Sequence, residues 1–456
     1  MPPPPHPPSP PPTPPPLSAH RLPLPLSHPP PASLLLAPPS SPARALALLF
    51  PDSSAHLFPS LPSLSPVATS SLAPTTVRSP LAAAACFALL LPSSHLLFLS
   101  AHPSPASPAV HLRAYSLASA PAFPRFVPAP LSFKRNASAS GLPLQGLPFG
   151  LGVRLAAGVN AVALLSLAAG QIWVLAPKLA ADGRTVELHK CAVIELEPVR
   201  PVYAMEIAMG RLLLGESGGL RVFPLRGLMK GGKEREGKKE SAVTAGKKCL
   251  SKKNGMVNGL VMPVRRREGD AVSTCKLTTL RVKQSSGSYC SSQNDDYKSQ
   301  GDMESMKSVK VVSIHPLSKN KFLVLDSSGV LHVFILPVIE MGSGAASKQY
   351  SENIHTYRLN HPMKVQLSAV FSSSSIKTQI FWVSDGGHSV HVMSAVEIES
   401  PNGDNGDVTR ERELATIKLS AIEAIFTSER VQDIVPISKD SILILGQGNM
   451  FLYGTS

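Results

Sequence analysis

Residues 314–325 read IHPLSKNKFLVL, and residues 434–445 read IVPISKDSILIL. Each copy runs from a P-x-S-K-[N/D] turn into an apolar strand, and the two copies begin 120 residues apart. A further pair of apolar runs, at 380–383 and 389–393, lies between them, so the interval holds two repeats of about 60 residues. A supersecondary unit that recurs every ~40–60 residues is typical of β-propeller blades.

Five pairs of short, β-branched runs follow one another from about residue 160, and each pair is joined by a tight turn that contains glycine. Such pairs indicate β-hairpins. The pairs are 162–167 with 172–175, 212–214 with 220–225, 322–325 with 330–336, 380–383 with 389–393, and 442–445 with 450–453. They predict an all-β fold in which residues 155–456 form a β-propeller of about five recognisable blades.

A β-sandwich is the alternative fold, since it also consists of repeated hairpins. Its strands normally recur every ~8–12 residues, whereas the near-copy 120 residues away favours blades. The last predicted strand ends three residues before Ser456. Closure of the ring then needs a strand from elsewhere, or the ring is incomplete, and residues 109–130 show no convincing strand to close it.

Residues 310–336 and 430–453 resemble the frame of the WD-repeat family, in which a turn, an apolar strand, a glycine turn and a second strand follow one another. The chain departs from that family's pattern, because the Gly-His pair is missing and no repeat ends in Trp-Asp. The place of Trp-Asp is taken by Trp173-Val174, Phe223-Pro224, Phe334-Ile335 and Tyr453-Gly454. The resemblance implies a divergent propeller that binds peptides or other domains through its inter-blade loops.

The first third of the chain has a different composition. Of the 46 prolines, 36 fall within residues 1–150, where Asp52 is the one acidic residue. Pro- and Ser-rich sequence with little periodicity buries too little apolar surface to offset the ordering of the backbone, which costs about 1–2 kcal/mol per residue. Residues 1–150 are therefore predicted to be a disordered low-complexity leader.

Three alternatives concern this leader. Its scattered arginines and lack of acids are typical of an organellar transit peptide, while a downstream chain start would explain it equally well. The apolar run 81–91 is shorter than the ~20 residues that a spanning helix needs, so no membrane span is predicted.

A basic insertion at 229–308 separates the second and third hairpins. Residues 230–283 contain 15 Lys or Arg and five acids, and 276–283 (KLTTLRVK) alternate as one strand of a blade would. The sequence predicts a solvated loop, with a nuclear-localisation signal or a nucleic-acid contact as alternatives. The contact residues would be Lys238, Lys239, Lys247, Lys248, Lys252, Lys253, Arg265, Arg266 and Arg267.

Gly215-Glu216-Ser217-Gly218-Gly219 matches the G-x-S-x-G pattern of a hydrolase nucleophile. That pattern requires a helix after the serine, whereas residues 220–223 form a predicted strand. The turn interpretation also explains the glycines of the other repeats. A serine hydrolase that uses Ser217 is thus the weaker alternative, and no enzyme activity is predicted.

No metal or cofactor site is predicted either. His388 and His391 are three residues apart on an expected strand and would point to opposite faces, and residues 402–407 lack the terminal Glu of a calcium loop. The five cysteines form no C-x-x-C pair, which favours a reducing compartment.

The sequence therefore predicts a non-enzymatic protein-interaction scaffold, whose partners are other proteins or peptides. The expected location is the cytoplasm or nucleus, with a plastid as the alternative that the acid-poor leader suggests.

Overall fold

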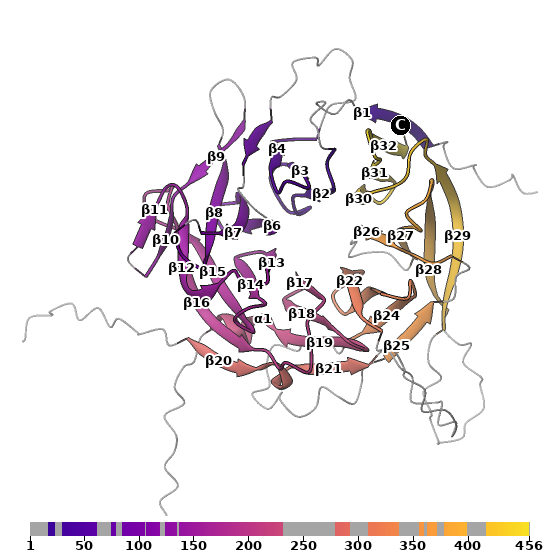
Figure 1. Ribbon diagram of the computed structural model, residues 1–456. Coiled ribbons are helices and arrows are strands. Elements are labelled where there is room, and N and C mark those ends of the chain that lie inside the picture. The colour runs from indigo at the N-terminus through magenta and orange to yellow at the C-terminus, as the bar shows by residue number, and fades with distance from the viewer. Residues whose placement is uncertain are drawn as a thin grey trace, which may run out of the picture.

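The computed structural model describes the following residues: 17–22, 30–61, 74–78, 84–104, 106–118, 124–134, 136–230, 279–291, 309–336, 355–359, 363–371, 378–398 and 416–455. Within them the strands form seven sheets, which stand in a ring around a central axis (Figure 1). The protein is a β-propeller, and each sheet is one blade. The blades are numbered here in chain order of their innermost strands.

Blade 1 contains β2 (Ser33–Leu36), β3 (Leu46–Leu49), β4 (Ala55–Phe58) and β5 (Thr75–Val77). Blade 2 contains β6 (Ala84–Leu90), β7 (His95–Pro103), β8 (Ala109–Ala118), β9 (Arg125–Ala129) and β12 (Leu142–Pro148). Blade 3 contains β13 (Val153–Gly158), β14 (Ala161–Ser166), β15 (Gln171–Leu179) and β16 (Val186–Glu195), extended by β10 (Leu131–Phe133), β11 (Asn136–Ser138) and β20 (Leu280–Lys283).

Blade 4 contains β17 (Ala204–Ala208), β18 (Arg211–Glu216), β19 (Gly219–Pro224) and β21 (Ser288–Ser291). Blade 5 contains β22 (Val311–Pro316), β23 (Lys321–Asp326), β24 (Leu331–Ile335) and β25 (His355–Leu359). Blade 6 contains β26 (Leu367–Val370), β27 (Thr378–Ser384), β28 (Ser389–Ile398) and β29 (Thr416–Phe426). Blade 7 contains β30 (Asp433–Ser438), β31 (Ser441–Leu445), β32 (Met450–Thr455) and β1 (Leu17–Leu22).

The five hairpins expected from the sequence are the middle strands of blades 3 to 7, and this prediction is confirmed. The turns of blades 3 to 6 contain glycines in the left-handed region, with φ of 60° at Gly170, 73° at Gly218, 85° at Gly329 and 75° at Gly386. Glycine adopts this conformation without the steric cost that a Cβ atom imposes. The near-copies at 314–325 and 434–445 occupy the same place in blades 5 and 7.

The prediction that residues 1–150 are a disordered leader is wrong for the described part of that stretch, which forms blades 1 and 2. Leucine and alanine supply the buried faces: Leu46, Leu48 and Leu57 have at most 1% of their surface exposed. Proline disrupts few hydrogen bonds between these strands. Pro128 lies on β9 and Pro143 on β12, and each of these strands pairs on one side only. An edge strand tolerates proline, since its outward N–H has no partner to lose.

The five blades recognised in the sequence are joined by two more that residues 33–148 form, and the ring is closed. The stretch 109–130, predicted to lack strands, holds β8 and β9. β1 closes the ring by pairing antiparallel with β32, from Leu17 opposite Thr455 to Leu22 opposite Met450. The first and last described strands of the chain thus share one sheet, which ties the two ends of the ring together.

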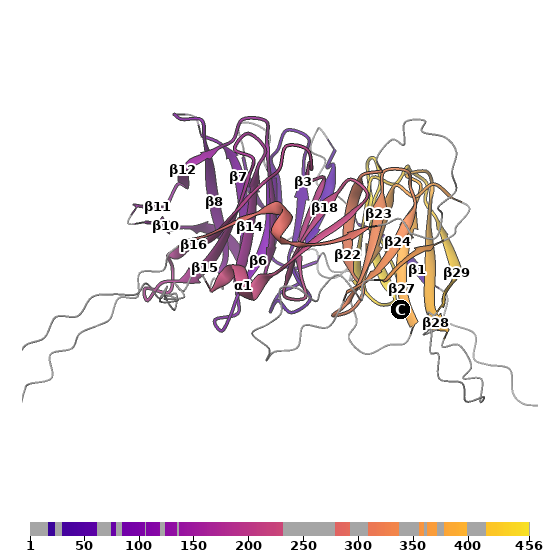
Figure 2. The ribbon, with the colours of Figure 1, turned by 90° about the horizontal axis from the view of Figure 1, so that it is seen from below.

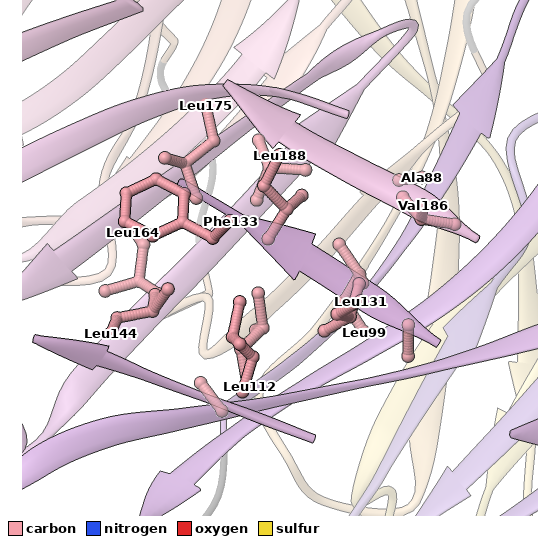
Figure 3. Close-up of a cluster of buried hydrophobic side chains, with 14 of the residues drawn as sticks. Ala88, Leu99, Leu112, Leu131, Phe133, Leu144, Leu164, Leu175, Val186 and Leu188 are labelled. Atoms are coloured by element: carbon pink, nitrogen blue, oxygen red, sulfur yellow. The ribbon is translucent and has the colours of Figure 1, made fainter. Parts of the chain in front are cut away.

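Apolar faces of neighbouring blades pack against each other around the whole ring. Figure 3 shows one such cluster, in which Ala88, Leu99 and Leu112 of blade 2 face Leu164 and Leu175 of blade 3. Burial of a Leu side chain contributes about 1.5–3 kcal/mol, so these interfaces account for much of the stability. At the closure of the ring, the Leu side chains of β3 pack in the same way against those of β31.

The innermost strands contact one another in the order β2, β6, β13, β17, β22, β26, β30 and back to β2. Viewed from the side, the blades stand upright and their turns gather at the two ends of the ring (Figure 2). This arrangement brings residues of distant sequence position together at the axis and on the two flat faces.

The basic insertion is held at both ends. The short helix α1 (Leu225–Met229) follows β19, and the chain returns as β20, which pairs parallel with β16 at the outside of blade 3. The strand expected within 276–283 is thus confirmed for 280–283. After one 3₁₀ turn (Gln284–Ser286), β21 becomes the outer strand of blade 4. No pattern in the sequence indicated this last strand.

Candidate functional site

One face of the ring is built from the turns between the two middle strands of each blade and from the connectors between blades. Backbone hydrogen bonds join these two kinds of segment: Leu167 N–H donates to Gly152 O over 3.2 Å, and Gly218 N–H donates to Val309 O over 2.7 Å. Val431 N–H donates likewise to Gly387 O. We call this surface the turn–connector face.

The turn–connector face carries the most exposed large apolar side chains of the described residues. Val199 is 84% exposed, Leu151 82% and Phe426 76%. Leu151 and Val199 lie in the connectors that enter and leave blade 3, and Phe426 ends β29 where the connector to blade 7 begins. Leu167, Val309 and Val312 add smaller exposed apolar areas on the same face.

The opposite face exposes less apolar surface. Leu91, Val159 and Met209 lie in the turns after the innermost strands of blades 2, 3 and 4, and each is 42–46% exposed. Asn160 connects two of these turns, because its side-chain oxygen accepts from Leu91 N–H over 2.8 Å. These three residues provide control positions for substitutions on the turn–connector face.

Charged groups also lie on the turn–connector face, in the connectors of blades 3 to 5. Lys310 Nζ lies 5.1 Å from the centre of the Tyr203 ring, a cation–π geometry. Arg200 Nε lies 3.5 Å from Glu197 Oε2, and the exposed Arg154 follows the connector at the start of β13. Exposed apolar and charged side chains occur together on protein-binding surfaces.

Ser217 lies in the turn between β18 and β19, as the turn interpretation predicted. Its backbone carbonyl accepts from the Tyr289 hydroxyl over 3.0 Å. On either side of the turn, Arg221 Nε donates to Glu216 Oε1 over 2.5 Å and Nη2 donates to Glu216 Oε2 over 3.0 Å. Both side chains are 3% exposed, so the G-x-S-x-G pattern is here the turn of a buried ion pair.

This ion pair also anchors the end of the basic insertion. Gln284, which is fully buried, donates from Nε2 to Glu216 Oε1 over 2.8 Å and to Arg200 O over 2.9 Å. Arg221 Nη1 donates to Gly287 O. Gly219 leaves no room for a side chain, because a Cβ would lie 2.0 Å from Cys290 O of β21. The glycine therefore serves close packing of two strands.

Two carboxyl groups lie on innermost strands. Burial raises the pKa of Glu206 on β17 to about 8. Burial also raises the pKa of Asp433 on β30 to about 6, against the effect of two backbone N–H donors, Leu34 and Ile434. The bond to Leu34 links blade 7 to blade 1 across the closure of the ring.

Some of the other candidate site residues lie within the described part of the chain, and the rest lie outside it. His388 lies in the turn before β28 and His391 on that strand. Residues 402–407 lie outside the described part of the chain. So do all nine residues of the basic patch, Lys238, Lys239, Lys247, Lys248, Lys252, Lys253, Arg265, Arg266 and Arg267.

Among the described residues, no three His, Cys, Asp or Glu side chains gather as they would around a metal ion. None of the helices in that part of the chain has the length and apolar character to cross a membrane. The apolar run 81–91 instead supplies β6.

No protein-family model and no curated protein sequence matches the chain. Solved structures do resemble it. The WD40 domain of SCAP from fission yeast is 10% identical, with 96% of this chain and 94% of that one covered at a TM-score of 0.45. A streptogramin B lyase structure is 8% identical, with 96% and 97% covered at a TM-score of 0.42. The assignment of the β-propeller fold rests on the strand pairing described above.

Proposed function

We propose that this chain is a protein-interaction scaffold that binds a partner protein or peptide on its turn–connector face. The observation that carries the proposal is the exposure of Val199, Leu151 and Phe426 on this one face. Large apolar side chains in water reduce solubility and add no packing energy to the fold. Their gathering on one face marks an interaction surface.

The partner surface would be apolar at its centre, because it has to cover side chains that are about four-fifths exposed in the free chain. The ring supplies rigidity, since turns and connectors are joined by backbone hydrogen bonds from blade to blade. A rigid surface loses little conformational entropy on binding. Binding, rather than chemistry at Ser217, is what these features support.

The test compares partner capture by the intact chain and by two double variants. Leu151→Asp with Val199→Asp places charges on the turn–connector face. Val159→Asp with Met209→Asp places the same charges on the opposite face, at similar turn positions. We expect the first variant to lose at least about tenfold in affinity for a captured partner, equivalent to 1.4 kcal/mol, and the second to bind as the unaltered chain does.

Equal capture by both variants would contradict the proposal, as would loss in the second variant alone. Thermal unfolding of all three proteins provides the control for folding. Because all four substituted side chains are exposed, the unfolding midpoints should agree closely.

A second candidate function rests on the basic insertion, whose 230–283 segment has ten more basic than acidic residues. The described residues at its two ends, α1 and β20, lie at blades 3 and 4. In this candidate the insertion contacts nucleic acid. Deletion of 231–278 should then abolish binding to a nucleic acid, and affinity for the intact chain should fall steeply with salt. Binding that ignores salt would exclude it.

A further inference from the structure

A chain of three polar side chains joins the innermost strands of blades 5 and 6. Ser313 and His315 lie on β22 and Ser368 lies on β26. The Ser313 and Ser368 hydroxyl oxygens are 3.2 Å apart, and His315 Nε2 is 3.1 Å from Ser368 Oγ. All three residues are partly accessible to solvent.

The direction of these hydrogen bonds depends on the tautomer of the imidazole. Burial lowers the pKa of His315 to about 4, so its ring is neutral near pH 7. In the tautomer that carries its proton on Nδ1, Ser368 O–H donates to Nε2, and Ser368 Oγ is then free to accept from Ser313 O–H. A neutral histidine that accepts from a serine hydroxyl is the arrangement of a base beside a nucleophile.

We propose that Ser368 is a nucleophile toward acyl substrates such as carboxylic esters and that His315 is its general base. Ser368 Oγ attacks the carbonyl carbon while its proton moves to His315 Nε2. The bond to the leaving alkoxide then breaks, and His315 returns the proton to that oxygen. Water attacks the acyl-Ser368 ester in the second half, again through His315, and releases the carboxylic acid.

Other serines of the described residues serve as references. Ser389 Oγ lies 3.1 Å from His391 Nε2, but these residues are two apart on one strand, where such a contact is local. Ser368 and His315 are 53 residues apart and are held by different blades. Ser217 belongs to the turn of the buried ion pair described above. Ser217 and Ser389 therefore provide matched control positions.

The experiment uses the full-length chain and a fluorescent fluorophosphonate, which reacts covalently with activated serines. We expect labelling of the unaltered protein, no labelling of Ser368→Ala, and labelling at least about 10²-fold slower for His315→Gln, the usual size of a general-base contribution. Ser217→Ala and Ser389→Ala should be labelled at the rate of the unaltered chain. Peptide mapping should place the label on Ser368.

Absence of labelling in the unaltered protein would overturn the proposal, and so would labelling that survives in Ser368→Ala. A purely structural role for the pair would lower the unfolding midpoint in His315→Gln without any labelling to lose. The turn–connector variant Leu151→Asp with Val199→Asp should be labelled normally, so failure of this proposal and failure of the binding proposal are distinguishable.

Discussion

Blades 1 and 2 have the same strand architecture as blades 3 to 7, but their amino-acid composition differs. The first glycine of the chain is Gly141, so none of the tight turns in blades 1 and 2 before that residue can use glycine. Ser53 and Ser94 take the left-handed conformation instead, with φ of 66° and 52°. Their strands contain leucine and alanine where the later blades use valine and isoleucine. A hairpin of the same structure can thus form without the turn glycines and β-branched residues by which hairpins are recognised in a sequence.

The largest expected effect tests whether blade 2 contributes to the common core. Phe98 on β7 is fully buried and lies 5.4 Å from the ring of Phe87, centre to centre. Phe334 on β24 is equally buried in blade 5. Phe98→Ala and Phe334→Ala should each lower the free energy of unfolding by about 3–5 kcal/mol, measured by denaturant titration. An unchanged stability in Phe98→Ala alone would mean that blade 2 is not part of the folded core.

The next prediction concerns blade 4, which buries the ion pair of Glu216 and Arg221, in contrast to the apolar core of blade 2. The measured quantity is the free energy of unfolding. Arg221→Met leaves the carboxylate of Glu216 buried without its cation, which should cost about 3 kcal/mol or more. The double variant Glu216→Met with Arg221→Met should recover part of that loss, since no charge then remains buried. If both variants unfold alike, the pair itself, rather than the orphaned charge, stabilises the blade.

Much of blades 3 to 7 could be predicted because glycine turns and β-branched runs are local signals. The closing strand β1 could not be found, since its pairing with β32 joins the two ends of the chain and leaves no local pattern. The outer strand β21 follows a 58-residue excursion after α1 and is held by Gln284 and Arg221, contacts that no spacing rule contains. The same holds for Ser368 and His315, which two separate blades bring together.

The pH dependence of stability should have opposite signs in the two regions. In blade 2, His102 and His111 share a hydrogen bond of 3.1 Å. Burial, together with the charge of Arg113, lowers the pKa of His102 to about 4. The folded state thus favours the neutral ring, so this contribution is complete above the unfolded pKa of ~6.5 and is lost as the pH falls toward 4. His102→Gln should flatten the decline of the unfolding midpoint over that range.

In blade 4, Glu206 behaves in the opposite way, since burial raises its pKa to about 8. The protonated carboxyl stabilises the fold below the unfolded pKa of ~4.3, and that contribution is lost as the pH rises through 8. Glu206→Gln keeps the side chain neutral. It should exceed the unaltered chain in stability at pH 9 by about 1.4 kcal/mol or more, the equivalent of one pKa unit, and match it below the unfolded pKa of ~4.3. A constant difference at all pH values would contradict this assignment.

The smallest effect concerns the turns themselves. A Cβ added at Gly170 meets nothing within 4 Å, so Gly170→Ala isolates the cost of a left-handed φ, about 1 kcal/mol. Ser94→Gly removes the same strain from a turn of blade 2 and should be neutral or stabilising by a few tenths of a kcal/mol. Thermal unfolding resolves the two signs. Destabilisation by Ser94→Gly as large as that by Gly170→Ala would mean that the two turns differ in backbone conformation.

The central claim is that residues within 17–148 belong to the same closed ring as residues 153–455. Hydrogen–deuterium exchange of the full chain tests it most directly. The account predicts that amides of β7 and β8 in blade 2 are protected to the same order of magnitude as those of β14 and β15 in blade 3, because both pairs are inner ladders of one cooperative fold. Exchange of the blade 2 amides at the rate of an unfolded peptide, beside protected blade 3 amides, would contradict it.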